Sequence, residues 1–345
     1  KDFDRILDRK DPAILFTRTQ EGNKTRTVWG YPAADTLLEM RYYRPLLDVQ
    51  SQVEWRQALK GPKYVDKYMQ RLVYLCDSVK DYYLLSVDFS AYDASVSKDL
   101  IDAAFYYIKA KFQLSSSNDL NYIRDRFSSI GIVTPDGVIN GNHGVPSGST
   151  FTNEVDSIVQ YIAAMSILDE DDYLGFQIQG DDGVYAIEES AYDKLIAKFE
   201  SLGLNVNKEK SYFEKNWAVY LQNLYHPDYP IASNQFGGVY PSYRALNRIL
   251  FQERFTNLEE IGLKGEDYFS IRAISILENC KYHPLFEDLV KFIYSLDKYK
   301  LGFSQDGLLK YSEHIKQTEG AGDIVVNQYG DELSGFNNFE TVKLI

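Results

Sequence analysis

The hydrophobic and polar positions along the chain first predict short β-strands. Residues 81–89 are aromatic and β-branched over the length of a strand, which indicates a β-strand that ends near Asp88. Residues 173–179 and 184–188 have the same character on either side of a Gly-Asp-Asp-Gly sequence, and they predict a hairpin with that sequence at its tip. Residues 131–141 contain two shorter β-branched runs separated by Pro-Asp-Gly, which predicts a second hairpin.

Helical periodicity lies between and after these strands. Residues 97–112 carry apolar side chains at helical spacing, and Ser97 is placed to cap the first turn. A glycine-rich loop leads into a long helix within residues 142–168. Residues 190–203 place their apolar side chains on one helical face, and the final glycine suits a C-terminal cap. The part from residue 226 onward is predicted to be mostly helical, with a polar C-terminal end that forms a tail or an extended wrap.

Composition limits the class of protein. A chain of 345 residues with 44% hydrophobic and 25% charged residues is predicted to be globular, with two or three subdomains. The net charge of -13 argues against a surface that binds nucleic acid everywhere, but it permits a basic channel inside an acidic shell. Cys76 and Cys280 are too few for a disulfide framework and indicate a reducing compartment. The scattered histidines argue against a zinc site.

The two ends of the chain and its apolar runs give weaker signals. The region up to about Trp55 is basic and rich in turn-forming residues, and it is predicted to be loop-like. The apolar run at residues 158–168 is too short to span a bilayer, and no signal peptide is recognisable. Because the chain starts at Lys1 and not at Met, we expect it to be a piece of a longer chain that lacks N-terminal elements.

Acidic side chains end the predicted strands. Asp181 and Asp182 lie at the tip of one hairpin, and Asp88 lies where another strand gives way to a loop. If these strands are neighbours, three carboxylates converge, and their repulsion requires cations. Carboxylate oxygens suit Mg²⁺ or Mn²⁺. Two such ions about 3.5–4 Å apart support in-line nucleotidyl transfer.

A Gly-Asp-Asp triplet alone has little specificity, since it is expected by chance in about one chain in twenty of this length. Its companions are "DFSAYD", "PSGSTFT" and the basic "NKTRTVWGYP". In this order, the four motifs resemble the palm and fingers motifs of viral RNA-dependent RNA polymerases. The chain is most similar to the partitivirus group of double-stranded RNA viruses, because of "GVPSGSTFTNEVDS", "GGVYPSYRALNRILFQERF" and "ILENCKYHP". The resemblance runs from about Lys24 to Pro284.

The resemblance implies a role for each matched residue in metal and nucleotide binding. Asp88 and Asp181 would be the principal ligands of both metal ions, with Asp182 in support. Asp93 would recognise the ribose 2′-hydroxyl, and its carboxylate can accept a hydrogen bond that deoxyribose cannot donate. In the Ser-Gly loop, Ser147 and Thr152 are expected to contribute to nucleotide selection, and Gly148 is expected to let the loop flex. Lys24 and Arg26 are expected to lie over the triphosphate, and Arg18 is a weaker candidate for the same role.

Two assignments stay open at this point. The resemblance implies a lysine that protonates pyrophosphate as general acid, and Lys210 is preferred over Lys208. Many related polymerases carry Asn nine residues after the serine of the Ser-Gly loop, whereas this chain has Asp156. A second carboxylate near Asp93 would need a shared proton or a cationic neighbour, so the details of sugar selection are undecided.

The resemblance implies an α+β fold of the right-hand polymerase type, in which an antiparallel palm sheet is flanked by helices. The expected division is fingers at 1–81 with an N-terminal part missing, palm at 82–97, a fingers insertion at 98–138, palm at 139–226, and thumb with C-terminal tail at 227–345. The enzyme would replicate and transcribe a viral RNA genome by a two-metal mechanism. Its partners would be RNA template and product, nucleoside triphosphates and viral capsid protein, without a membrane. Its location would be the host cytoplasm, within the virion.

Two other classes of protein remain as alternatives. A reverse transcriptase would share the metal site, but it would carry a bulky residue in place of Asp93 to exclude the ribose hydroxyl. A noncatalytic viral RNA-binding protein would need no aspartate cluster, and a large separation between Asp88 and Asp181 would favour it. The sequence does not decide between primed and de novo initiation, and it does not identify the virus or the host.

Overall fold

The chain divides into two compact units. The computed structural model describes residues 10–20, 24–113, 116–252, 255–317, 336 and 338–345. Unit 1 comprises Lys1–Leu59 and Arg71–Leu221, and unit 2 comprises Lys60–Gln70 and Gln222–Ile345. The assignment of segments to fingers, palm and thumb stays a prediction, because this division does not separate fingers from palm.

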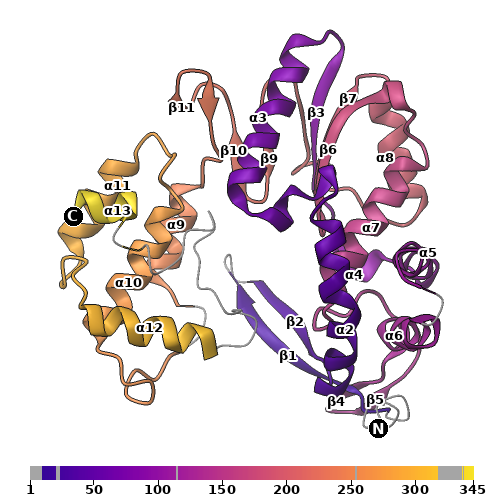
Figure 1. Cartoon of the computed structure of the whole chain (residues 1–345), viewed down its shortest axis with the longest axis horizontal. Helices are drawn as coiled ribbons and strands as arrows, with labels where there is room; N and C mark the ends of the chain where they lie inside the picture. Colours follow the sequence, from indigo (N-terminus) through magenta and orange to yellow (C-terminus); the bar gives the residue numbers. More distant parts are fainter. Residues whose placement is uncertain (1–9, 21–23, 114–115, 253–254, 318–335, 337) are drawn as a thin grey trace. The chain divides into compact units, whose positions relative to one another are not determined.

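An antiparallel sheet lies at the centre of unit 1. Its strand order is β6-β7-β3-β8, and its strands are β3 (Tyr82–Val87), β6 (Tyr173–Gln179), β7 (Asp182–Glu188) and β8 (Tyr212–Glu214). Helices α7 (Thr152–Met165) and α8 (Ala191–Ser201) pack against β6 and β7 (Figure 1). The predicted strand at 81–89 and the predicted hairpin around Gly-Asp-Asp-Gly are confirmed. A short strand, β9 (Ala218–Tyr220), contacts β3 and β7.

Helices α5 (Lys98–Lys109) and α6 (Ser117–Ser129) pack against each other, and α5 also packs against α7. Ser97 caps α5 as predicted, since its Oγ accepts a hydrogen bond from the amide of Leu100 at 3.4 Å. The apolar face of α5 is buried in the core of unit 1. The glycine predicted to end α8 is Gly203, which has a left-handed φ of 84°. A one-turn helix, α4 (Tyr92–Ser95), follows β3.

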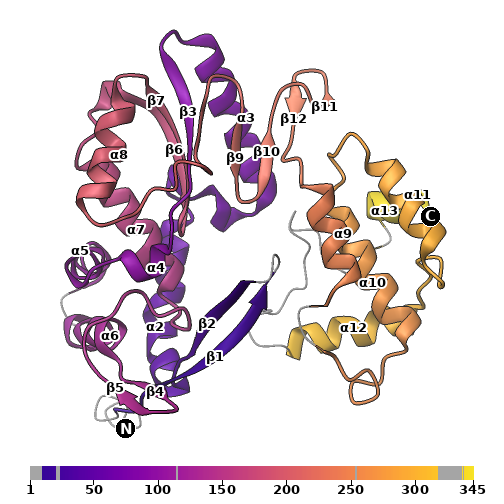
Figure 2. The same cartoon turned by 180° about the vertical axis from the view of Figure 1, so that it is seen from behind.

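The prediction of a loop-like region up to Trp55 is wrong. Strands β1 (Ala13–Gln20) and β2 (Lys24–Gly30) form a long antiparallel hairpin, which joins β4 (Ile132–Thr134) and β5 (Gly137–Ile139) in the order β2-β1-β4-β5 (Figure 2). Backbone pairing builds this hairpin, and the polar side chains at residues 25–27 are exposed. A strand without a buried apolar face lacks the alternation that identifies strands in a sequence.

Two further elements lie in the same region, the helix α2 (Ala33–Gln50) and the 3-10 helix η2 (Glu54–Lys60). The buried stripe of α2 includes Asp35, Glu39 and Gln50 as well as apolar residues. These buried polar side chains conceal the helical periodicity of the segment.

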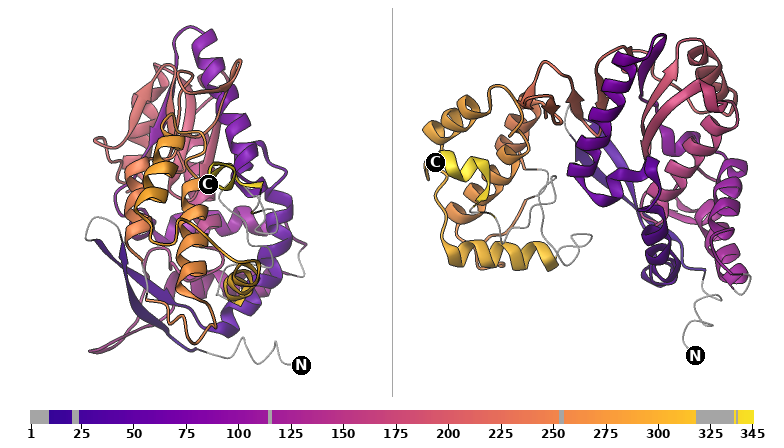
Figure 3. Two further views of the ribbon diagram at one scale, coloured as in Figure 1. Left: turned by 90° about the vertical axis from the view of Figure 1, so that its left-hand side faces the viewer. Right: turned by 45° about the horizontal axis from the view of Figure 1, so that its top comes forward.

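Unit 2 is mostly helical, as predicted. Its strands are β10 (Asn223–Tyr225), β11 (Pro230–Ala232) and β12 (Gln235–Phe236). Its helices are α9 (Ser242–Leu250), α10 (Gly265–Glu278), α11 (Phe286–Leu296), α12 (Gln305–Gln317) and α13 (Glu340–Leu344), and α3 (Pro62–Ser78) begins in this unit. Helix α10 contacts α9, α11, α12 and α13, so it forms the centre of a bundle (Figure 3, orange to yellow).

The C-terminal end is not a free tail where the structure describes it. Phe336 and Phe339 are buried in the core of unit 2, and the carboxylate of Glu278 accepts hydrogen bonds from the Thr341 amide and hydroxyl. The remainder of the predicted tail, residues 318–335 and 337, lies outside the described residues. None of the helices in the described part of the chain is long and apolar enough to cross a membrane.

Candidate active site

The pairing of β3 with β7 brings the predicted metal ligands to one end of the central sheet. Val87 lies opposite Gly183, so Asp88, the next residue, comes directly beside the turn that holds Asp181. The negative charge of Asp88 also contributes to the pKa of Asp181. The large separation that would favour a noncatalytic protein is therefore not observed.

Helix α7 holds the turn that carries Asp181. Gly180 has a left-handed φ of 65°, and its amide donates to the Ser157 hydroxyl at 2.7 Å. The side-chain amide of Gln160 donates to the carbonyls of Gly180 and Asp181, both at 3.2 Å. A Cβ at Gly183 would lie 1.9 Å from Gln160 Oε1, so a larger residue there would displace the side chain that holds the turn.

The sequence alone did not identify Ser157, Gln160 and Gly183 as supports of the site. The one available signal was Gly183 itself, because a glycine inside a strand often marks a close approach of another group.

Neighbouring carboxylates contribute to the raised pKa values of Asp181 and Asp93. Asp181 is exposed at the turn, but partial burial of its carboxyl group raises its pKa. The negative charge of Asp88 raises this pKa further, and the positive charge of Arg26 lowers it. Burial also raises the pKa of Asp93, where Asp181 adds to the effect and Arg26 again opposes it. These mutual effects place Asp88, Asp93, Asp181 and Arg26 in one electrostatic neighbourhood.

Asp156 joins this neighbourhood from α7. It is 4% exposed, and its Oδ1 has no hydrogen-bond partner among the described residues. Burial raises its pKa well above the ordinary value, and the charges of Asp93 and Asp181 raise it further. The predicted proximity of Asp156 and Asp93 is therefore observed, and the carboxyl group of Asp156 favours its protonated form.

The Ser-Gly loop packs against β2. The amide of Trp29 donates to the Ser147 hydroxyl at 3.1 Å. A Cβ at Gly148 would lie 1.9 Å from the carbonyl oxygen of Trp29, so close packing gives a direct reason for glycine at this position. The hydroxyl of Thr152 donates to the carbonyls of Pro146 at 2.6 Å and Ser149 at 2.8 Å, which closes the loop onto the start of α7.

Two arginines lie opposite each other on the β1–β2 hairpin. Arg18 pairs with Arg26 in the strand register, and Gln20 pairs with Lys24. The expected position of the Lys24 side chain over the triphosphate stays a prediction. The side chain of Lys24 lies outside the described residues. Like charges directly opposite each other are unfavourable in a sheet.

The two candidate general acids differ in their surroundings. Lys208 Nζ lies 3.5 Å from Glu200 Oε1 on the surface of α8. Lys210 is exposed, and its amide donates at 3.1 Å to the carbonyl of Asn207. The Asn207 amide in turn donates to the Asp88 carbonyl at 2.8 Å. The turn from Asn207 to Lys210, which carries both lysines, is therefore fastened to the end of β3, and the preference for Lys210 stays a prediction.

The predicted convergence of three carboxylates is not met in the described part of the chain. There, no three side chains of the His, Cys, Asp and Glu types are grouped so that they could hold a metal ion. Asp182 is the first residue of β7 and directly follows Asp181, which lies in the turn. The charge of Asp182 raises the pKa of the buried Tyr220 hydroxyl, after burial itself.

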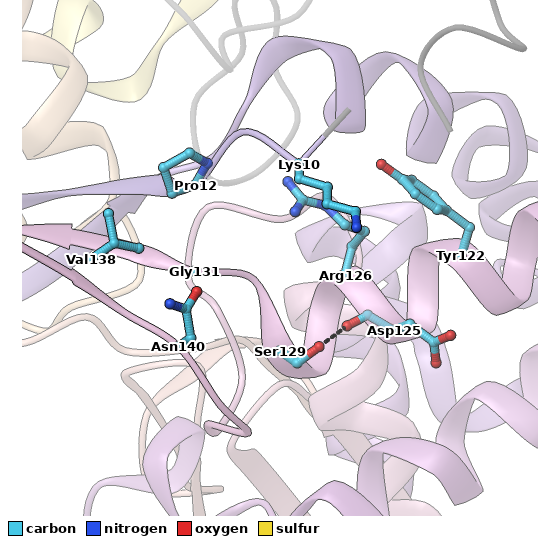
Figure 4. Close-up of a pocket in the computed structure, with 9 residues that line it drawn as sticks. All are labelled: Lys10, Pro12, Tyr122, Asp125, Arg126, Ser129, Gly131, Val138 and Asn140. Carbon is cyan, nitrogen blue, oxygen red and sulfur yellow. Dashed lines mark hydrogen bonds between the residues drawn. The ribbon is translucent and has the colours of Figure 1, made fainter. Parts of the chain in front are cut away.

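A separate pocket lies away from these carboxylates. It has a volume of about 450 Å³ and lies beside α6 and the β4–β5 hairpin, where Lys10, Tyr122, Arg126 and Asn140 contribute to its lining (Figure 4). Arg126 is already paired with Asp35, with Nη2 2.9 Å from Oδ2. None of the predicted site residues lines this pocket.

An antiparallel sheet with aspartates at adjacent strand ends, beside an arginine-bearing hairpin and a Ser-Gly loop, defines the palm of the polymerase class. The family model described as viral RNA-dependent RNA polymerase matches residues 12–236. The chain belongs to this family, and the resemblance found in the motifs is confirmed.

Relatives and solved structures agree with this assignment. The chain is 30% identical over 318 residues to a potential RNA-dependent RNA polymerase of a human picobirnavirus, which covers 86% of this chain and 57% of the relative. It is 28% identical to the RNA-directed RNA polymerase of Cryptosporidium parvum virus 1, which covers 88% of this chain and 60% of the relative. The grouping with polymerases of double-stranded RNA viruses is consistent with both relatives, and a partitivirus-like placement fits it.

The crystal structure of the RNA-dependent RNA polymerase of a human picobirnavirus has a TM-score of 0.81, with 27% identity, and the match covers 96% of this chain and 65% of that chain. The predicted α+β polymerase fold is therefore confirmed. The chain spans about 60% of the length of the curated relatives it matches.

Proposed function

We propose that this chain catalyses template-directed RNA synthesis from nucleoside triphosphates and releases pyrophosphate. The observation that carries the proposal is the position of Asp88 beside Asp181 at the ends of adjacent strands, with Arg26 close enough to alter the pKa of Asp181. An acidic pair near a guanidinium group suits a nucleotide whose triphosphate is bound together with divalent cations.

Asp88 and Asp181 would hold two Mg²⁺ ions, or Mn²⁺ as a substitute, with Asp182 in support. The donor set fits Mg²⁺, because this ion is usually bound by one or two carboxylates and completed by substrate phosphates and water. A site of this kind does not need three converging protein carboxylates. When bound, such ions polarise the attacking hydroxyl and neutralise charge on the leaving pyrophosphate.

The side chains of this chain would supply position and protons. Arg26, with Lys24 and Arg18, would bind the triphosphate, and its pairing geometry suits phosphate oxygens. Asp93 would accept a hydrogen bond from the ribose 2′-hydroxyl. Lys210 would donate a proton to pyrophosphate as it leaves.

The carboxylate at Asp93 argues against the reverse transcriptase alternative. A carboxylate beside the sugar accepts a hydrogen bond from ribose and leaves an unpaired acceptor with deoxyribose. The proximity of Asp88 and Asp181 argues against the noncatalytic alternative. In its biological setting, the polymerase would replicate and transcribe a viral RNA genome in the host cytoplasm, within the virion and in contact with capsid protein.

Nucleotide incorporation on an RNA template tests the proposal. The purified chain is incubated with template, labelled nucleoside triphosphates and Mg²⁺, and elongated product is measured. Asp181→Asn keeps the shape of the side chain but removes its charge, so we expect an unchanged fold and a loss of at least about 100-fold in rate. Asp171→Asn is the matched control, because Asp171 is exposed and lies in the 3-10 turn before β6, at the end of the strand away from Asp181.

Full activity of Asp181→Asn would refute the role of this carboxylate. A folded wild-type chain that incorporates no nucleotide would refute the proposed activity for this chain. A chain that prefers deoxyribonucleotides would support the reverse transcriptase alternative.

A further inference from the structure

A buried carboxylate on α2 contacts the Ser-Gly loop. Glu39 is 1% exposed. Its Oε1 accepts a hydrogen bond from the Ser149 hydroxyl at 2.8 Å, and its Oε2 accepts from the Thr150 amide at 2.8 Å and the Thr150 hydroxyl at 2.9 Å. All three donors lie in one short segment that directly follows Ser147 and Gly148. None of the motifs identified in the sequence includes Glu39.

The three donors match what a carboxylate can accept. Ser149 Oγ also accepts a hydrogen bond from the Phe151 amide at 3.1 Å, which directs its own proton toward Glu39. The contact therefore links α2 to the last residues before α7. A carboxylate is an acceptor at both oxygens, so one side chain can satisfy all three groups at once.

A buried carboxylate is costly unless it is paired with a cation or fully hydrogen-bonded. In the described part of the chain, the loop donates three hydrogen bonds to Glu39, and no ion pair of Glu39 with lysine or arginine is found. The buried hydroxyl of Tyr31 lies near the same carboxylate, whose charge contributes to raising the pKa of the tyrosine after burial itself. The neighbouring Asp35 is paired with Arg126. The contact of Glu39 is thus directed at the loop and not at a neighbouring cation.

The other side of the loop is held by β2. The Trp29 amide reaches Ser147, and the Trp29 carbonyl touches Gly148. The loop is therefore held between a strand on one side and a helix on the other, over consecutive residues from 147 to 150. Loss of either support would let Ser147 move relative to the sugar of a bound nucleotide.

We propose that Glu39 is a positioning residue that holds the Ser-Gly loop in the conformation needed for sugar selection. The inference rests on the proposed polymerase function. Glu39 would not touch the nucleotide, and it would act through the loop.

Three variants and two measurements test the inference. Glu39→Ala removes all three acceptors, and Glu39→Gln keeps one carbonyl oxygen for the two groups of Thr150. Asp35→Asn is the matched control, because it alters another buried carboxylate on the same helix that pairs with Arg126 and not with the loop. The first measurement is hydrogen exchange of the loop, and the second is the ratio of kcat/KM for a ribonucleotide to that for its deoxyribonucleotide.

We expect Glu39→Ala to speed exchange at the Thr150 amide and to lower the discrimination ratio by about tenfold or more, which is the effect of losing hydrogen bonds to a charged group. Glu39→Gln should restore the ratio to within about threefold of wild type. The control should leave the ratio unchanged. If Glu39→Ala does not fold, the double variant Ser149→Ala with Thr150→Val removes two donors from the loop side, and it should lower the ratio in the same way.

Several results would overturn the inference. An unchanged discrimination ratio in Glu39→Ala or in the double variant would overturn it. An equal loss of discrimination in Asp35→Asn would also overturn it, because such a loss would indicate general destabilisation. If the wild-type chain incorporates no nucleotide, the proposed function fails separately, and hydrogen exchange still decides the positioning role. Faster exchange at Thr150 then supports it, and unchanged exchange overturns it.

Discussion

The contact between Gly148 and β2 allows a quantitative prediction. A Cβ at position 148 would lie 1.9 Å from the Trp29 carbonyl oxygen, 3.0 Å from its carbonyl carbon and 3.2 Å from the Tyr31 nitrogen. All three atoms belong to backbone, so no side-chain rotation can relieve the overlap. In Gly148→Ala, the loop and β2 must separate by about 1 Å, since Cβ contacts below 3.0 Å essentially do not occur.

The expected cost of this separation has two parts. Overpacking of a close contact typically destabilises a protein by about 1–3 kcal/mol. For a unit of this size, each kcal/mol lowers Tm by about 2–4 °C. A displacement of about 1 Å in a group that positions a substrate can reduce the rate by about 100-fold. The variant should therefore lose more activity than stability.

Thermal unfolding and nucleotide incorporation are the two assays. Gly265→Ala is the matched control, because Gly265 begins α10 and a Cβ there would meet other atoms only at 3.4 Å or more. The control should be neutral or stabilised by up to about 1 kcal/mol. If Gly148→Ala keeps both the Tm and the rate of wild type, the packing of the loop against β2 is refuted.

Three other predictions concern stability. Burial raises the pKa of Glu39 to about 7 despite its hydrogen bonds, and the charge of Asp35 adds to the effect. Because the folded state holds this proton more tightly than the unfolded state, the free energy of unfolding should fall as the pH rises from about 4.5 to 7. Glu39→Gln should reduce this pH dependence, as measured by denaturant titrations. The side chains of Arg56 and Glu154 are both fully buried, with Nη2 2.6 Å from Oε2. Arg56→Met should lower the free energy of urea unfolding by about 3–5 kcal/mol, and the double variant Arg56→Met with Glu154→Leu should recover most of that stability. A loss below about 1 kcal/mol for the single variant would contradict this. Ser97→Ala should cost about 1 kcal/mol through loss of the α5 cap, and an unchanged Tm would contradict it.

Regular elements with an apolar face were predictable from the sequence. The strands β3, β6 and β7 and the helices α5 and α8 were found because apolar side chains recur at the period of the element. Ser97 and Gly203 could be assigned for the same reason, since each ends such a pattern with a suitable capping residue. The β1–β2 hairpin was missed because it has no buried apolar face, and α2 was missed because its buried face includes polar side chains.

The motif residues were predictable, but their supports were not. Asp88 and Asp181 could be brought together by reasoning from strand ends. The contact between Glu39 and the loop joins residues that are 110 positions or more apart, and only the tertiary fold determines such contacts. Gly148 was predicted to provide flexibility, whereas the structure explains it by close packing. Flexibility of the loop stays a prediction.

The arrangement of charges in unit 1 accounts for an acidic chain in an RNA polymerase family. Arg18 and Arg26 lie directly opposite each other on the hairpin, and like charges at such positions repel each other. The charge of Asp181 adds to the effect of burial in raising the pKa of Asp93, and Arg26 lowers the pKa of both aspartates. A nucleoside triphosphate bound with divalent cations presents anionic oxygens and positive ions together, so it could relieve both repulsions at once. Substrate binding would then need positive potential only over this short stretch, and the remaining surface can stay acidic without opposing the proposed function.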